Sequence, residues 1–445
     1  MRLYNTLNRV VEEFVVEDNT VNMYVCGITP YAPSHLGHAM CAIVFDVIRR
    51  YLEYKGYKVH FIQNFTDIDD KMITAANDEG IEVSELAERN IQAYLSELRH
   101  LNVLPASEYP RATEEIGSIV AVISDLIEKE YAYAISGDVY FRVKQDEDYG
   151  KLSRRNVDEL LAGARLEIEK TKENPADFAL WKSQKPGEPA WDSPWGQGRP
   201  GWHIECTAMS LTYLNNRVDI HGGGQDLVFP HHENEIAQSC CANRTENFAN
   251  FWLHNGFVTF NKEKMSKSFG NIVTLSKFRE NINGQVVRLA LLSSHYKQPL
   301  DWNEKLINES QNTLDKWYTQ FDKTEAEELH EDLFHPLLED LNTPEYISKL
   351  HLLYDETSKG NKSSKVKFLS ACKFIGLLEE DKQSWENFKK SKAKVDENFI
   401  NQKIKDRNNA RKTGDYKLAD IIRTELENNG VIIEDKTDQT TWKYK

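Results

Sequence analysis

Twelve residues, 230–241, with the sequence PHHENEIAQSCC, concentrate two histidines, two acidic residues and two cysteines. His231 and Glu235 lie four residues apart, so on a helix both side chains leave the same face. Their donor atoms suit zinc, but a zinc ion in a protein needs at least three protein ligands. The same spacing is typical of the polar face of an ordinary helix. A metal site is therefore predicted only if further ligands are found.

Two cysteines elsewhere in the chain are candidates for the missing ligands. Cys26 lies near the end of an apolar, β-branched run, VNMYVCGI. Cys206 opens the helical pattern WHIECTAMSLTYL, which follows a loop rich in Pro, Gly and Trp. With His231 and Glu235 they form a set of two thiolates, one imidazole and one carboxylate, which suits zinc. Taken singly, either cysteine is more readily explained as a small buried hydrophobic residue.

The segment SHLGH, residues 34–38, indicates phosphate chemistry. It lies between the first strand pattern and a long helical pattern, and a helix amino terminus attracts phosphate through its free N–H groups and partial positive charge. Gly37 lets a ligand approach the backbone, and His35 and His38 flank it with hydrogen-bond donors. In isolation the segment is more readily explained as two histidines in a surface turn.

A second candidate phosphate element is KMSKS, residues 264–268. It places Lys264 and Lys267 beside two hydroxyls, and these charges suit the departure of pyrophosphate from a triphosphate. A lone lysine pair is usually solvated surface. The combination with SHLGH favours the functional interpretation.

A βαβ unit predicted over residues 21–64 must position these motifs. An apolar run, a loop with two prolines, a helical pattern that ends at Gly56 and the second strand pattern YKVHFIQNF follow one another. This order is typical of a doubly wound parallel sheet, which binds ligands beyond the carboxyl ends of its strands. The next segment predicts a helix with Thr66 as its N-cap and Asp69 three residues on.

The chain has 445 residues and a formal net charge of −15, so a nucleic-acid partner requires a local basic face. Such a face is present between Lys392 and Arg423, where nine Lys or Arg residues stand against five Asp or Glu. No signal peptide and no apolar run of about 18 residues is found, which excludes a membrane-spanning class. Six sparse cysteines favour free thiols or metal ligands in a reducing cytoplasm over a disulfide framework.

HLGH and KMSKS, in this order on a split doubly wound sheet, resemble the signature of class I aminoacyl-tRNA synthetases, with Leu36 where the family motif has isoleucine. The segments that resemble the cysteinyl-tRNA synthetases in particular are YVCGITPY, NFTDIDDK, DFALWK, PGWHIECTAMS, DIHGGGQDLVFPHHENEIAQ and KMSKSFGN. This resemblance covers nearly the whole chain. It implies zinc at the positions of Cys26, Cys206, His231 and Glu235, and an amino-acid pocket formed by Thr66, Trp202, His221 and Asp226.

The resemblance also implies a reaction and its partners. The carboxylate of L-cysteine attacks the α-phosphate of ATP, which binds with Mg²⁺, and a ribose hydroxyl of the terminal adenosine of tRNA(Cys) then attacks cysteinyl-adenylate. One Zn²⁺ per chain selects the substrate thiolate over serine, because a hydrophobic pocket separates such near-isosteres only about 10- to 200-fold. A cytoplasmic monomer without membrane contact is expected.

The expected fold class is an α/β protein with a doubly wound, Rossmann-like parallel-sheet catalytic domain, split by an insertion and followed by α-helical domains. Its expected parts are the first half of the catalytic domain (1–115), a mostly helical insertion or connective peptide (116–200), the second half with the KMSKS loop (201–300), a helical bundle (301–390) and an anticodon-binding domain (391–445). In the last part, Trp442 and Tyr444 are candidates for stacking on bases.

Two alternatives remain open at this stage. A ligase that joins cysteine to an amino sugar in mycothiol synthesis would share the zinc set and both signature motifs, but it resembles a synthetase without the 391–445 module. A non-catalytic RNA-binding relative would be expected to have lost HLGH, KMSKS or the metal ligands, all of which are intact.

Overall fold

The computed structural model describes residues 1–155, 172–215, 217–264, 274–321, 329, 331–435 and 439–444. A parallel four-stranded sheet is central to its first 310 residues. The strand order is β10-β9-β3-β4, and every neighbouring pair is parallel. The sheet joins two distant parts of the chain, as predicted. Its strands and its first crossover helix are β3 (Thr20–Ile28), α1 (Leu36–Tyr54), β4 (Lys58–Phe65), β9 (Val218–Gly224) and β10 (Ala249–Asn255).

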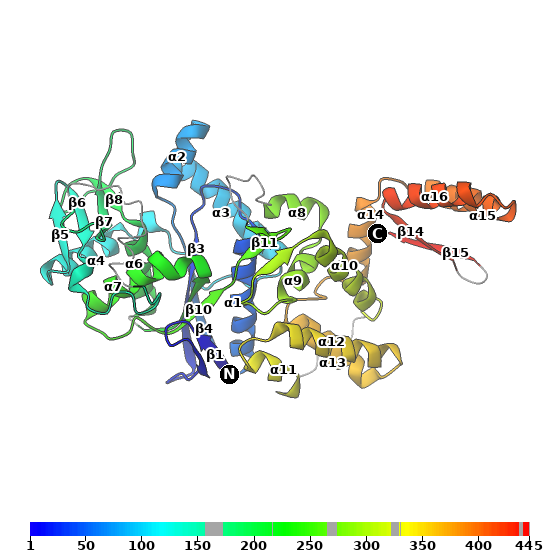
Figure 1. Ribbon diagram of the computed structural model, residues 1–445, viewed down its shortest axis with the longest axis horizontal. Helices are drawn as coiled ribbons and strands as arrows, with labels where there is room; N and C mark the ends of the chain where they lie inside the picture. Colours follow the sequence, from blue (N-terminus) through cyan, green and yellow to red (C-terminus); the bar gives the residue numbers. More distant parts are fainter. Residues whose placement is uncertain are drawn as a thin grey trace. The chain divides into compact units, whose positions relative to one another are not determined.

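Helices cover both faces of this sheet (Figure 1). On one face, α6 (Trp202–Leu214) and α7 (Glu233–Asn243) pack against the strands through a core that includes Tyr24, Met209 and Ile236. Helix α1 lies on the other face, where its Phe45 approaches Gly222 so closely that a Cβ at Gly222 would overlap the ring. The doubly wound α/β class is therefore confirmed.

The helix predicted after β4 begins later than expected. Helix α2 (Asp70–Glu79) has Asp69 as its N-cap, and the carboxylate of Asp69 accepts a hydrogen bond from the Met72 backbone N at 2.7 Å. The prediction of Thr66 as the cap was wrong. The backbone N of Thr66 instead donates to the Ile28 carbonyl at 3.1 Å, which continues the pairing between β3 and β4.

The described part of 116–200 contains an antiparallel sheet, so the expectation of a mostly helical insertion was wrong for these residues. One helix, α4 (Ile116–Glu128), precedes the sheet order β5-β6-β7-β8. Ser136 and Gly137, both with positive φ, form a two-residue hairpin turn, a strong strand signal within a charged sequence. The four strands are β5 (Ala132–Ile135), β6 (Asp138–Phe141), β7 (Phe178–Ser183) and β8 (Gly198–Pro200).

The rest of the first 310 residues surrounds the sheet. No helix in the described ranges is long and apolar enough to cross a membrane. The remaining strands of this part are β1 (Arg2–Asn5), β2 (Val10–Glu13), β11 (Val258–Phe260), β12 (Glu263–Lys264) and β13 (Leu300–Trp302), and the remaining α-helices are α3 (Val83–His100), α8 (Leu275–Asn281) and α9 (Gly284–Leu292). Four short helical segments complete it: the 3₁₀ helices η1 (Ala112–Glu114), η2 (Val143–Gln145) and η3 (Gln225–Leu227), and the π-helical turn η4 (Val228–His232).

Helices dominate the chain after β13, as predicted. The C-terminal module has its own apolar core of six buried residues, against which Trp442 and Tyr444 pack partly buried. The elements of this region are α10 (Glu304–Tyr318), α11 (Glu331–Leu338), α12 (Thr343–Ser358), α13 (Lys362–Phe374), α14 (Lys382–Lys392), α15 (Glu397–Lys412), α16 (Tyr416–Asn428), β14 (Val431–Asp435) and β15 (Thr440–Tyr444).

Candidate active site

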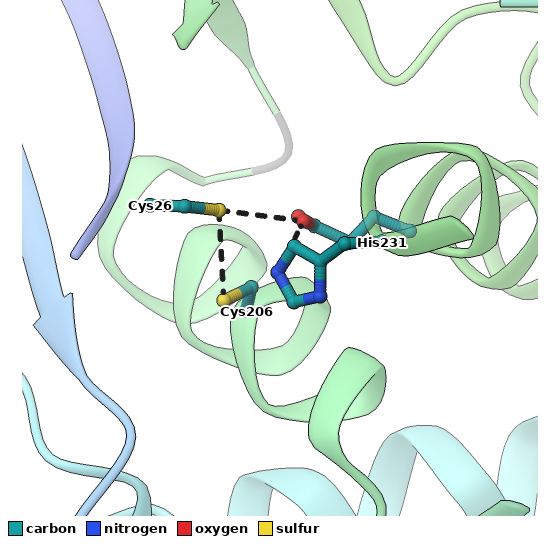
Figure 2. A group of neighbouring side chains, drawn as sticks. Cys26, Cys206 and His231 are labelled. Carbon is teal, nitrogen blue, oxygen red and sulfur yellow. Dashed lines mark hydrogen bonds and ion pairs between the residues drawn. The ribbon is translucent and has the colours of Figure 1, made fainter. Parts of the chain in front are cut away.

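Cys26, Cys206, His231 and Glu235 converge at the carboxyl end of β3. Their potential ligand atoms all lie within 4.8 Å of one another, and all four residues are buried. In Figure 2 the sulfur of Cys26 lies beside the sulfur of Cys206 and beside a carboxylate oxygen that also contacts the His231 ring. The four residues come from the end of β3, the second turn of α6, the segment η4 and the first turn of α7. The structure thus brings together the set proposed from sequence.

The spacing of these atoms fits a small tetrahedral metal ion. Cys26 Sγ lies 3.7 Å from Cys206 Sγ and 3.4 Å from Glu235 Oε1, and His231 Nε2 lies 3.1 Å from the same oxygen. A tetrahedral zinc ion with bonds of about 2.0–2.3 Å separates its ligands by about 3.3–3.8 Å. Two sulfur donors, one nitrogen and one oxygen also match the preferences of zinc.

The electrostatics of the cluster favour ionised ligands at two positions. A hydrogen bond from Cys26 lowers the pKa of Cys206 to about 6, against the effect of burial. Burial raises the pKa of Cys26 well above the usual thiol value. Burial also disfavours ionised Glu235, but His221 and His231 hold its pKa well below the usual carboxyl range. Burial opposes protonation of His231, yet Glu235 and Cys206 raise its pKa to about 10.

A second grouping shares two residues with the first. Cys26, His221, His232 and Glu235 also place ligand atoms within 4.8 Å of one another. His221 Nε2 lies 3.7 Å from Cys26 Sγ and 3.2 Å from Glu235 Oε2. This set has one sulfur donor, so the set with two thiolates suits zinc better. His232 is not among the ligands predicted from the sequence, although it belongs to this second grouping.

The structure also identifies a neighbour of the cluster that sequence reasoning missed. His203 Nδ1 lies 2.9 Å from His231 Nδ1, on the side of the ring away from Glu235. The available signal was the position of His203 in the first turn of the helix that carries Cys206.

The two histidines of SHLGH cap α1 and have defined tautomers. His35 Nδ1 accepts from the Gly37 backbone N at 3.1 Å, and His38 Nδ1 accepts from the His35 backbone N at 3.2 Å. Each ring therefore carries its proton on Nε2 when neutral. Burial lowers the pKa of both residues, strongly for His38, where His35 also contributes. A Cβ at position 37 would lie 2.9 Å from the His35 ring, which explains the glycine.

The lysine motif lies largely outside the described residues. Lys264 ends β12, where only its backbone is described, and Lys267 falls within 265–273. Residues 274 and 275, which follow the motif, lie beside the SHLGH turn. The Leu275 backbone N donates to the Ser34 carbonyl at 2.9 Å, and Thr274 forms a β-bridge with His35.

Of the four expected pocket residues, Trp202 and His221 lie beside the metal-ligand cluster, and Asp226 lies on the side of SHLGH. Trp202, which is 37% exposed, has its ring centroid 4.5 Å from that of His231. Thr66 and His221 are buried, and His221 lies against the metal-ligand cluster. Asp226 is exposed in η3 on the side of SHLGH, where its charge partly offsets the effect of burial on the His35 pKa.

A family model and individual relatives match this chain over most or all of its length. A family model described as the tRNA synthetase class I (C) catalytic domain matches residues 12–312. The cysteine–tRNA ligase of Pelagibacter ubique is 49% identical over 100% of this chain and 99% of that protein. The cysteine–tRNA ligase of one Dehalococcoides mccartyi strain is 47% identical, with 100% of both chains covered.

A solved structure supports the fold. The methionyl-tRNA synthetase of Mycobacterium tuberculosis, bound by methionyl-adenylate, matches with a TM-score of 0.56 and 15% identity, covering 80% of this chain and 90% of that one. At this identity the likeness concerns the fold alone, and it agrees with the doubly wound sheet described above.

Proposed function

The chain belongs to the cysteinyl-tRNA synthetases, the cysteine–tRNA ligases of class I, and on this premise we propose how its residues activate L-cysteine with ATP and charge tRNA(Cys). The observation that carries the residue assignments is the buried cluster of two cysteines, a histidine and a glutamate at the carboxyl end of β3. The amino-sugar ligase considered earlier receives no support from these relatives.

Cys26, Cys206, His231 and Glu235 are assigned to one Zn²⁺ per chain. When bound there, zinc supplies a soft Lewis acid that accepts the substrate sulfur as thiolate and discriminates against the harder serine hydroxyl. The four ligands come from four different elements, and Trp202 lies partly exposed beside His231. Trp202, Thr66 and His221 form the walls of the cysteine pocket in this proposal.

His35 and His38 are assigned to the phosphates of Mg²⁺-bound ATP. Backbone N–H groups donate to their Nδ1 atoms, which leaves Nε2–H as the donor on each ring. A neutral N–H donor aimed at a developing negative charge needs no proton transfer and little reorganisation. Lys264 and Lys267 are assigned to the departing pyrophosphate, and Asp226 to the ammonium group of cysteine. In this proposal no side chain acts as a nucleophile, and positioning carries the chemistry.

Residues 391–445 are assigned to the anticodon of tRNA(Cys). The local excess of basic residues near α15 supports an RNA partner within an acidic protein. A ligase of this kind is assigned to the cytoplasm as a monomer. Trp442 Nε1 donates to Asn401 Oδ1 at 3.2 Å, so this ring also serves the module's own structure.

A charging assay tests the proposal directly. Purified enzyme with zinc, ATP and a tRNA(Cys) transcript is expected to attach labelled cysteine and not labelled serine. Cysteine-dependent ATP–pyrophosphate exchange without any charging of the transcript would contradict the assignment of the second substrate.

Removal of residues 391–445 is expected to separate the two half-reactions. Cysteine-dependent ATP–pyrophosphate exchange should persist, since every described residue of the active site precedes residue 311. Charging of tRNA should fall on the order of 10- to 100-fold, the effect of losing one or two stacked bases at about 1–3 kcal/mol each. Circular dichroism of the truncated chain provides the folding control. Equal losses in exchange and charging would show that the module is structural.

A further inference from the structure

His203 contacts the proposed metal centre without belonging to it. It is the second residue of α6, three positions before Cys206. Its Nδ1 atom lies 2.9 Å from His231 Nδ1, while the other nitrogen of His231, Nε2, lies 3.1 Å from Glu235 Oε1. The His231 ring is therefore held between two polar partners, one within the ligand cluster and one outside it.

Two ring nitrogens at this distance share one proton. One must donate and the other must accept, because two lone pairs or two N–H groups would repel each other. A histidine that binds a metal through Nε2 uses the lone pair there and carries its proton on Nδ1. His231 is then the donor and His203 Nδ1 the acceptor, and His203 carries its own proton on Nε2.

We propose that His203 is a positioning residue of the metal centre, whose Nδ1 accepts the Nδ1–H of His231 and so directs the Nε2 lone pair of His231 toward the metal. The inference rests on the proposed zinc assignment of His231. Histidine ligands commonly donate their second N–H to such a partner, which fixes the tautomer and the ring orientation.

The charge of the ligand set explains why a histidine is suited to this place. Two thiolates and a carboxylate already carry three negative charges against the two positive charges of zinc. A carboxylate partner for His231 would add a fourth negative charge in a buried region, at a cost in desolvation. A neutral imidazole accepts the same hydrogen bond without that charge.

Three substitutions at this position separate the accepted hydrogen bond from ring packing. His203→Asn keeps an acceptor oxygen close to the position of Nδ1. His203→Gln keeps the same amide but displaces it by one methylene, toward the position of Nε2, and His203→Leu has no acceptor. The readouts are zinc affinity by chelator competition and the visible spectrum of the cobalt-substituted protein, with circular dichroism as the folding check.

The Gln and Leu variants are expected to bind zinc about 10- to 100-fold more weakly than the unmodified protein and to show a changed cobalt spectrum, while the Asn variant stays close to it. Wild-type zinc affinity and spectrum in His203→Leu would overturn the inference. Equal losses in the Asn and Gln variants would also overturn it, since ring packing would then be the cause. If the unmodified protein bound no zinc, the metal assignment itself would fail.

Discussion

Cys206→Ser is expected to lower the cysteine-over-serine preference of amino-acid activation from above about 10⁴ to the range of about 10–200 that a pocket of shape alone provides. Cys206 supplies one of two sulfur donors in the buried cluster, 3.7 Å from the other. A serine hydroxyl is a harder and much less acidic ligand, so the variant should lose zinc and, with it, affinity for cysteine. ATP binding should be retained, since SHLGH caps a helix on the opposite face of the sheet.

The measurements are zinc content, cysteine affinity and the activation rates with cysteine and serine. Cys240→Ser is the matched control, because Cys240 lies on α7 with its sulfur directed toward the Glu246 carbonyl, outside the cluster. Full cysteine affinity in a zinc-depleted Cys206→Ser protein would rule out the metal as the selector of the thiol.

His38→Ala is expected to slow the formation of cysteinyl-adenylate about 10²–10³-fold, the usual effect of removing one preorganised donor to a developing charge. Cysteine binding should change little, since the metal ligands are provided by other elements. Pre-steady-state adenylation and equilibrium cysteine binding, measured separately, check the two parts of this prediction. An unchanged adenylation rate would remove His38 from the phosphate site.

The tautomer of His38 predicts which substitutions keep the hydrogen-bond donor. The active donor is inferred to be Nε2–H, because Nδ1 accepts the His35 backbone N–H. The amide nitrogen of Gln reaches close to the position of Nε2, so His38→Gln should retain more activity than His38→Asn. Burial lowers the pKa of His38 well below 6.5, and the neighbouring His35 ring lowers it further. The His38 ring therefore stays neutral as the pH falls from 8 to 6. Its contribution to the rate should be constant over that range, and a loss that follows a pKa near 6.5 would contradict the neutral form.

Local patterns in the sequence were sufficient to predict a parallel sheet and to group two of the four cluster residues, His231 and Glu235. β3 reads as a continuous apolar run because it is buried on both faces, and the i, i+4 spacing of His231 and Glu235 directs both side chains to one place. The pairing of Cys26 with Cys206, 180 residues away, depended on the family resemblance, since no local pattern specifies so distant a contact.

Several features depended on tertiary contacts that the pattern does not contain. The charged sequence of the insertion masked its four strands, although the Ser-Gly turn between β5 and β6 was a usable signal. Asp69 rather than Thr66 caps α2, because the backbone of Thr66 still pairs with the end of β3 and the helix begins only at Asp70. The hydrogen bond between His203 and His231 could not be predicted, since it depends on how α6 and η4 approach each other.

The presence of Cys26 and Cys206 in the cluster has a consequence for the accuracy of protein synthesis over time. Each new copy of the chain receives these two residues from tRNA that older copies have charged. On the proposed role of the centre, a population of enzyme that mischarges serine places serine at these positions in some of its successors, and those successors discriminate less well. The frequency of mischarging by existing enzyme molecules therefore affects the frequency of mischarging by the molecules made after them.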